Sequence, residues 1–570
     1  MTLSLGTTGR GQEVRLTAEE RSWHMQVVGG SGRGKSSLLE SMIRQDILAG
    51  RGLCLIDPHG TLADDVVAWC ASRRVNDVRR VHVIEASDPD WSASFNPLRL
   101  DGVSDPSVRV DAMVAACAQV WGGEDPNRTP LLRKCLTAVF YALAVRGLTL
   151  VEATELISSV DPHRVRRTLT ENLPDPVFDG LWRDFNGLTR SEFVEQFGST
   201  SSRLNLFLKS PSVRRMLGQT SRSLDLKQVM DGGEILIVNL APKNKLSHEN
   251  ARVLGTLLTS ELFLLAVARD RTRATRRPFT LYIDECSEFV TDDVERMLDQ
   301  TRKFGLHVVL AHQRLSQLRR RSEFIHDAVL GGTHTKVVFG GLMDDDAEIM
   351  AREVFRGTFN LERPKHVLDK PVVVDEVPYW LESESSTDSY STTEMTGETS
   401  GWQSASGSTE GQSERFGPEP DKYDPYGVSR STSSISSMGE SGSTHSSYGH
   451  TEGWSRTSGR GQTLKPVRQI MPTAVYSLEE ELHLAIAKLR GLPKQAAVVK
   501  RPNGLPLRIR PQDVAPAASG KLRAQPFVEA ARVASGFIVP AEIAEAEIAE
   551  RRAALRSKER PREDAEFWSE

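Results

Sequence analysis

The sequence of 570 residues predicts an α/β fold built on a mostly parallel central sheet. Strand and helix signals alternate between residues 13 and 100, and strand signals return between residues 234 and 339. Several predicted strands, such as Ile235–Val238 and His307–Leu310, are almost entirely apolar, which is typical of strands covered by helices on both faces. A chain of this length is expected to contain about three or four domains.

The elements of the sheet follow from short apolar runs separated by segments with helical periodicity. The expected strands are Gln26–Val28, Leu53–Asp57, Val81–Glu85, Glu234–Leu240, Phe279–Asp284, Leu306–Ala311 and Thr335–Phe339. The expected helices between them are Ser36–Leu48, Asp64–Ser72, Ser247–Arg269 and Asp292–Phe304.

Three further segments interrupt or follow the sheet. Apolar residues recur at spacings of three and four between the two halves of the sheet, which predicts an all-helical insertion. A later segment rich in Ser, Thr, Gly and Glu has too few aliphatic residues to offset chain entropy, so we expect a disordered linker. The remaining tail carries a helix, two short strands around an Asn503–Gly504 turn and charged helices, which predicts a small C-terminal α+β module.

These patterns divide the chain into five parts. The expected boundaries are 1–104 and 228–380 for the two parts of the sheet domain, 105–227 for the helical insertion, 381–462 for the linker and 463–570 for the C-terminal module.

Composition excludes several classes of protein. Hydrophobic residues make up 39% and charged residues 26% of the chain, values of a globular protein. The longest apolar run, around Leu262–Ala268, follows polar residues, so no membrane span is expected, and the N-terminus has no signal-peptide pattern. We therefore expect a cytoplasmic protein, with a peripheral position at a membrane complex as the alternative. The cysteines show no metal-binding spacing and are interpreted as reduced structural thiols: Cys54, Cys70, Cys117, Cys135 and Cys286.

Charge is unevenly distributed along the chain. The net charge is −4, but residues 381–460 hold 12 acidic and 5 basic residues, so the rest of the chain is positive. Arginines cluster in the positive part, and each cluster fits either a nucleic-acid surface or a solvated face. The clusters are Arg73, Arg74, Arg79 and Arg80; Arg164, Arg166 and Arg167; Arg271, Arg273, Arg276 and Arg277; and Arg319, Arg320 and Arg321.

A glycine-rich motif follows the first predicted strand and precedes a helix. It has the G-x-x-x-x-G-K-[ST] pattern of a phosphate-binding P-loop, whose backbone N–H groups and helix N-terminus point at phosphate oxygens. Lys35 is expected to reach the β- and γ-phosphates of ATP, and the Ser36 hydroxyl to bind magnesium. The expected nucleotide-binding residues are Gly29, Gly30, Ser31, Gly32, Arg33, Gly34, Lys35, Ser36 and Ser37.

A second motif, Phe279–Glu285, is an apolar strand that ends in two carboxylates. Ligands of open α/β sheets bind at the carboxyl ends of the strands, so this pattern indicates a Walker B segment. Asp284 is expected to hold magnesium, and Glu285 to orient or deprotonate the attacking water.

Three other residues are candidates with open alternatives. Asp57 ends a strand and could assist the metal, although the Asp-Pro-His-Gly sequence also suits a turn. Gln313 follows the strand Leu306–Ala311, where an amide could sense the γ-phosphate. Arg302 precedes a turn and could act as an arginine finger on a neighbouring subunit, although cations also suit a helix C-terminus.

Further motifs carry a family resemblance. Residues 43–52 run from the end of the P-loop helix into the next strand, and Asp57–Gly60 follows that strand. Phe95–Leu98 follows the third strand, Gly233–Leu240 precedes the Walker B segment, and residues 301–313 follow it. In this order the motifs resemble the HerA/FtsK superfamily of ring ATPases, in particular the conjugative coupling proteins of type IV secretion (TraG/TraD-like). The match covers about residues 13–352.

The resemblance implies a RecA-like P-loop NTPase domain that assembles as a homo-hexamer and translocates DNA, single- or double-stranded, with ATP and magnesium as cofactors. It also implies active-site roles for Asp57 and Gln313 and suggests a membrane-anchored secretion partner, a relaxase or a nuclease. Because the P-loop begins at Gly29, we expect no N-terminal membrane anchor of the kind such relatives carry. The alternatives are a motor that works with a nuclease in DNA processing or defence, an ATPase that moves protein substrates, and a slow NTP-dependent scaffold.

Overall fold

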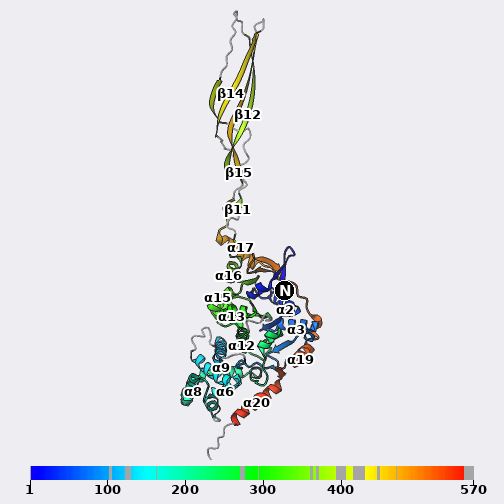
Figure 1. Ribbon diagram of the computed structural model, residues 1–570, viewed down its shortest axis with the longest axis vertical. Coiled ribbons are helices and arrows are strands. Elements are labelled where there is room, and N and C mark those ends of the chain that lie inside the picture. Colours follow the sequence, from blue (N-terminus) through cyan, green and yellow to red (C-terminus); the bar gives the residue numbers. More distant parts are fainter. Residues whose placement is uncertain are drawn as a thin grey trace, which may run out of the picture. The chain divides into compact units, whose positions relative to one another are not determined.

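The structure is a computed structural model, shown in Figure 1 with its elements labelled. It divides into two compact units, Met1–Phe359 with Leu482–Glu570, and Asn360–Glu481. The residues described are 2–101, 105–121, 130–161, 164–269, 277–292, 294–359, 364–367, 372–392, 406–414, 430–445, 450–469 and 472–557.

The first unit is built around an 11-stranded sheet in the order β2-β1-β18-β17-β10-β3-β9-β8-β4-β7-β5. The strands from β10 to β5 in this order all run parallel, whereas β17, β18, β1 and β2 extend the sheet with antiparallel pairs. The parallel strands are β3 Met25–Val28, β4 Gly52–Asp57, β5 Val81–Glu85, β7 Ile235–Asn239, β8 Phe279–Ile283, β9 Leu306–His312 and β10 Thr335–Phe339. The antiparallel strands are β1 Leu3–Thr8, β2 Glu13–Leu16, β17 Ala497–Lys500 and β18 Leu507–Arg510. The predicted α/β fold with a mostly parallel sheet is confirmed.

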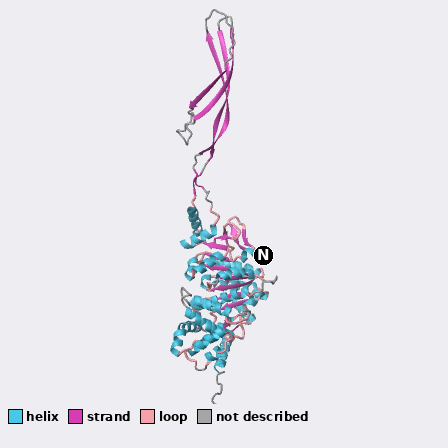
Figure 2. Cartoon of the chain, turned by 60° about the vertical axis from the view of Figure 1, so that its left-hand side comes forward, coloured by secondary structure: helices cyan, strands magenta, loops and turns pink. Residues whose placement is uncertain are grey.

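Successive residues of a central strand enter two different hydrophobic cores. In β4, Leu53 and Leu55 pack into one core, while Cys54 and Ile56 pack into the other. This alternation is what the two-residue repeat of a strand requires when helices cover both faces, and Figure 2 shows helices on both sides of the strands. The helices of this part are α1 Ala18–Ser22, α2 Lys35–Leu48, α3 Thr61–Arg73, α12 His248–Val267, α13 Val294–Thr301, α14 Leu315–Arg321, α15 Glu323–Gly332 and α16 Asp344–Phe355.

The segment between β6 (Trp91–Ala93) and β7 is helical, as predicted, and shares its core with one face of the sheet. Its helix α4 packs on α12, and a buried ion pair between Arg109 and Glu261 joins them. The insertion therefore does not form a core of its own. Its helices are α4 Pro106–Trp121, α5 Pro130–Val145, α6 Ala153–Leu156, α7 Val165–Thr170, α8 Pro176–Gly187, α9 Arg190–Leu208, α10 Pro211–Leu217 and α11 Leu226–Gly232.

The end of the chain does not form the separate module expected for residues 463–570. The hairpin β17–β18 pairs with β10 on one side and β1 on the other, so it lies inside the main sheet. The turn signal at Asn503–Gly504 predicts the hairpin but not its neighbours, because the free edge of β10 is far away in sequence. The remaining elements are α17 Leu478–Arg490, α18 Ala518–Lys521, α19 Ala524–Ser535, β19 Ile538–Pro540 and α20 Ala541–Ser557.

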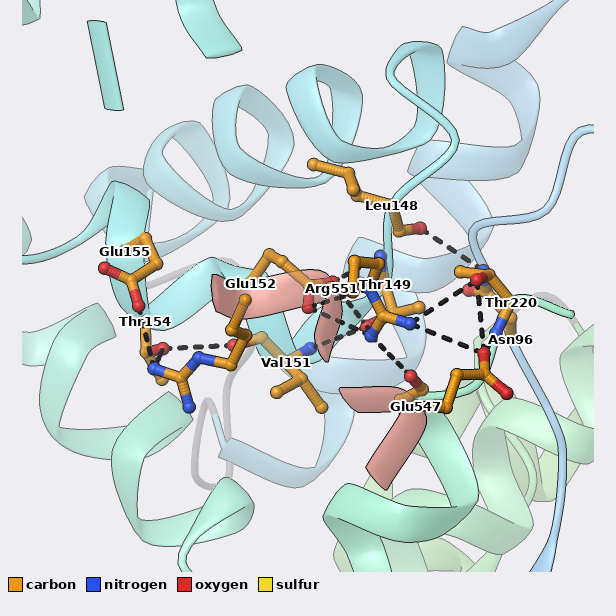
Figure 3. A network of polar contacts seen from close by, with 12 residues as sticks. Asn96, Leu148, Thr149, Val151, Glu152, Thr154, Glu155, Thr220, Glu547 and Arg551 are labelled. Carbon is orange, nitrogen blue, oxygen red and sulfur yellow. Dashed lines mark hydrogen bonds and ion pairs between the residues drawn. The ribbon is translucent and has the colours of Figure 1, made fainter. Parts of the chain in front are cut away.

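Helix α20 binds the helical insertion through a polar network (Figure 3). Arg551 donates to Glu152 Oε1 at 3.0 Å, and Glu547 accepts the backbone N–H of Thr220 at 2.6 Å. Glu152 is fully buried, so its carboxylate is satisfied by these contacts rather than by water. Helix α20 thus joins the strand pair β19–β6 to the insertion.

The second unit contains long antiparallel strands in part of the segment expected to be a disordered linker. Its four-stranded sheet has the order β12-β15-β14-β13, and its boundaries, 360 and 481, differ from the expected 381 and 462. Disorder stays a prediction for the residues of this segment outside the described ranges. The strands are β11 Pro364–Val367, β12 Val372–Thr392, β13 Ser406–Glu414, β14 Arg430–His445, β15 His450–Gln469 and β16 Pro472–Val475.

One described helix, His248–Val267, is long and apolar enough by length and composition to cross a membrane. Within its most apolar window, 83% is buried inside the structure. This helix is α12, whose side chains fill the core beneath the sheet, so its apolar character is explained by packing.

Candidate functional site

The P-loop connects β3 to α2, and its glycines are required by close contacts. A Cβ on Gly29 would lie 2.5 Å from the Cβ of Phe339, and a Cβ on Gly30 would lie 2.7 Å from the carbonyl oxygen of Gly341. Gly34 has a φ of +118°, which residues with a side chain rarely adopt. The loop therefore wraps closely against the end of β10, leaving its exposed Ser31 and Gly32 on the outer side.

Lys35 and Ser36 open helix α2, where backbone N–H groups favour an anion. The Lys35 Nζ donates to the carbonyl oxygens of Gly29 at 2.8 Å and Gly30 at 3.3 Å, so its ammonium lies inside the loop. Burial lowers the pKa of Lys35, and the nearby Glu285 and Asp284 carboxylates oppose this shift. The arrangement suits a cation that meets phosphate oxygens.

The sheet order brings the Walker B carboxylates to the P-loop. β8 lies one strand away from β3, with only β9 between them, and the carboxyl ends of these parallel strands share one edge. The pKa of Asp284 is raised to about 6 by burial and by the neighbouring Glu285 and Asp57 carboxylates, while Lys35 opposes the shift. Cationic ligands are therefore favoured beside Asp284, because they stabilise its charged form.

Glu285 and Gln313 are in direct contact. Gln313 Nε2 donates to Glu285 Oε1 at 2.7 Å, across the ends of β8 and β9. Glu285 has a left-handed backbone, with φ of 46°, which is uncommon for a residue with a side chain and often marks a functional position. The sequence predicted both residues separately, and the structure brings them together.

Asp57 is fully buried at the end of β4 and close enough to Asp284 to affect its pKa. Its carboxylate accepts backbone N–H bonds from His59 at 2.8 Å and Ala63 at 2.9 Å, so it holds the turn and the first turn of α3. The turn interpretation is therefore correct, and a catalytic role for Asp57 stays a prediction.

Arg302 does not lie with these residues. Arg302 precedes β9, whereas Gln313 follows it. The two residues therefore lie at opposite ends of this strand, about 20 Å apart for a strand of this length. The Arg302 guanidinium lies over the Trp23 ring, 3.0 Å from its centroid. Arg302 therefore cannot serve the nucleotide site of its own chain from this position.

The described arginines of the four clusters have different roles. The Arg79 guanidinium donates to the carbonyl oxygens of Ile47 and Gly233, so it binds the backbone of its own chain. Arg319 and Arg320 on α14 are exposed. Arg271, Arg273 and Arg276 lie outside the described residues.

Two further residues beneath the site carried no sequence motif. Gln26 Nε2 lies 2.9 Å from His312 Nε2, and His312 Nδ1 lies 3.2 Å from the Arg314 carbonyl oxygen. Burial lowers the pKa of His312 to about 3, so the ring is neutral and can accept from the amide while donating to the carbonyl. This pair fixes the end of β9 directly before Gln313.

The magnesium expected with ATP fits the residues present. Among the described residues, no three His, Cys, Asp or Glu side chains form a metal-binding group. Magnesium on a nucleotide usually takes one or two protein oxygens and completes its shell with phosphates and water. Ser36 and Asp284 supply such a set.

Comparisons with known proteins identify a family for one segment of the chain. Residues 278–361 match the protein family described as "TraM recognition site of TraD and TraG". This segment belongs to the TraG/TraD coupling-protein family. It holds Asp284, Glu285, Arg302 and Gln313, so the predicted resemblance is confirmed. Among curated proteins, no sequence matches this one.

Solved structures of coupling proteins are similar to this chain in fold. Plasmid coupling protein TrwB in complex with a non-hydrolysable ATP analogue is 14% identical, with a TM-score of 0.50 and coverage of 90% of each chain. The bacterial conjugative coupling protein TrwBdeltaN70 is 15% identical, with a TM-score of 0.49 and 90% of each chain covered. VirB4 of Thermoanaerobacter pseudethanolicus is 16% identical, with a TM-score of 0.43, covering 62% of this chain and 87% of that one.

Proposed function

We propose that this chain is an ATPase that drives DNA through a homo-hexameric ring during conjugative DNA transfer. The observation that carries the proposal is the contact between Glu285 and Gln313 at the edge of the sheet where the P-loop and Asp284 also lie. A P-loop alone binds nucleotide, whereas a base and an amide beside it can orient a water for hydrolysis. Membership of residues 278–361 in the TraG/TraD family supports the choice of DNA transfer.

Each residue has a defined task in this proposal. The P-loop N–H groups and Lys35 bind and orient the phosphates, and bound magnesium would neutralise the charge that develops on them. Glu285 orients and deprotonates the attacking water, while the Gln313 amide holds the Glu285 carboxylate and reaches towards the γ-phosphate. Asp284 and Ser36 would hold the magnesium ion. A nucleoside triphosphate is expected as substrate, since one solved TrwB structure carries a non-hydrolysable ATP analogue and another a GTP analogue, and we propose ATP for this chain.

The position of Arg302 determines which nucleotide site it could serve. At the strand ends opposite Gln313, Arg302 lies away from the nucleotide site of its own chain, so a role in hydrolysis would be at the site of another copy. We propose that it is the arginine finger of the neighbouring subunit.

Mixing two inactive variants tests this assignment. Lys35→Ala and Arg302→Ala each remove one half of a shared site, so a mixed ring should regain ATPase activity, since some sites then hold both intact halves. No gain over the separate variants would show that Arg302 does not act between subunits.

The proposed partners are DNA and a protein that resembles TraM, because TraM recognition is the description of the matching family. A relaxase or a membrane-anchored secretion partner, and a cytoplasmic place beside it, belong to the same proposal.

ATPase assays with single-stranded and duplex DNA test the proposed function. We expect DNA to stimulate hydrolysis, salt to weaken DNA binding steeply, and Glu285→Gln with ATP and DNA to trap six-fold rings that hold DNA. ATPase activity without DNA stimulation or binding would contradict a DNA motor and favour protein substrates.

A further inference from the structure

The catalytic residues determine which way a triphosphate must lie. Glu285 and Gln313 end β8 and β9, on one side of the P-loop strand β3. The γ-phosphate has to meet these two residues. A triphosphate that crosses the P-loop therefore leaves it on the other side of β3, where β10 and β17 lie.

The residues beside the P-loop on the β10 side of β3 come from a distant part of the chain. β17 pairs with β10, and the residues before β17 pack on the P-loop. The Gln495 N–H donates to the carbonyl oxygen of Arg33 at 2.9 Å. A Cβ placed on Gly34 would lie 3.5 Å from Gln495 Cα and 3.7 Å from Gln495 Cγ. The Cα and Cγ atoms of Gln495 therefore lie directly beside the P-loop backbone.

Gln495 is an unusual residue for its backbone. Its φ of +59° lies in the left-handed region, which favours glycine or asparagine. The described contacts of this residue with Arg33 use its backbone N–H, a bond that glycine would make as well. A half-buried primary amide in this place is therefore available for a ligand.

We propose that Gln495 contacts the nucleoside of the bound triphosphate and favours adenine. A glutamine amide offers one donor and one acceptor side by side, the complement of the N6 and N7 positions of adenine, whereas guanine presents an acceptor at both positions. This inference rests on the proposed function only in that the P-loop binds a nucleoside triphosphate.

The test measures ATP and GTP affinity by competition against a fluorescent ATP analogue, using the full chain with Glu285→Gln to prevent hydrolysis. Gln495→Gly keeps the backbone N–H and suits the positive φ, so it removes only the amide. We expect the preference for ATP over GTP to fall roughly tenfold. Gln495→Asn, which tolerates this backbone, should lose part of the preference because its amide is one methylene shorter. Lys494→Ala, an exposed neighbour, is the matched control and should leave the preference unchanged.

The possible outcomes separate the two proposals. An unchanged ATP preference in Gln495→Gly, or a wild-type chain without any preference, would overturn the role of Gln495. Equal losses of ATP and GTP affinity would also overturn it, since they indicate that Gln495 only supports the P-loop. If the wild-type chain binds neither nucleotide and behaves like Lys35→Ala, the proposed function itself fails.

Discussion

The ion pair that fastens α20 to the helical insertion offers a sharp test of the fold. The Glu152 carboxylate is completely buried, and its Oε1 accepts from Arg551 Nη2 at 3.0 Å and Nε at 3.2 Å. Its other oxygen, Oε2, accepts from the Thr149 N–H at 2.9 Å and hydroxyl at 2.7 Å. Arg551→Ala therefore removes both donors of one buried oxygen while the other oxygen stays satisfied.

The expected cost follows from this geometry. Removing one partner of a buried pair costs about 3 to 5 kcal/mol, and the remaining Thr149 contacts place Glu152 at the lower end, about 3 kcal/mol. That corresponds to a change of roughly 150-fold in the equilibrium between docked and undocked α20. The control is Arg556→Ala on the same helix, because Arg556 is 47% exposed and Glu155 keeps Arg552 as a partner. We expect the control to cost at most about 1 kcal/mol.

Hydrogen exchange of α20 and residues 149–152 measures the difference directly. Exchange should accelerate strongly in Arg551→Ala and little in Arg556→Ala. Adding Glu152→Gln to Arg551→Ala should recover part of the protection, because the buried charge is then gone. Equal exchange in the two single variants would refute the claim that this buried pair fastens α20.

Three other predictions concern the site and its support. Burial lowers the pKa of His24 from 6.5 to about 4, so the unfolded chain binds its proton first as pH falls, and stability should drop by roughly 3 kcal/mol between pH 6.5 and 4. His24 Nδ1 accepts the Val308 N–H at 3.1 Å, so protonation of the ring breaks this bond. The free energy of unfolding of His24→Asn, measured with denaturant, should therefore depend less on pH than that of the wild type. An equal dependence in the two proteins would contradict this. Gly30→Ala should lower nucleotide affinity at least about tenfold, because the new Cβ meets a backbone oxygen, whereas Gly9→Ala, with open space around it, should not; equal titration curves would show that the loop yields. Glu285→Gln should reduce kcat by about 100-fold or more while ATP binding persists, and retained turnover would remove Glu285 as the base.

The chemistry of the site was largely determined by local sequence. The P-loop and the Walker B pair are continuous motifs whose residue types are dictated by phosphate binding, so the sequence alone predicted Lys35, Asp284 and Glu285 in the places where the structure has them. Parallel strands flanked by helices followed from hydrophobic periodicity for the same reason, since each pattern reports a local geometry.

The partners of these residues depended on the tertiary structure. Which strand lies beside which is decided by contacts between residues that are far apart in sequence, so neither the Gln313 contact with Glu285 nor the seat of Arg302 on Trp23 could be derived from spacing. The same holds for residues 497–510. The local turn signal predicted a hairpin in a separate module, but in the structure this hairpin pairs with β10 and belongs to the main sheet.

The sequence by itself thus predicted a nucleotide site and the residues that could act there. Only the tertiary structure decided that the Arg302 guanidinium lies over the Trp23 ring and that the Gln495 N–H donates to the Arg33 carbonyl oxygen of the P-loop. The physical reason is that motifs encode local backbone and chemistry, whereas sheet order and burial result from packing of the whole chain.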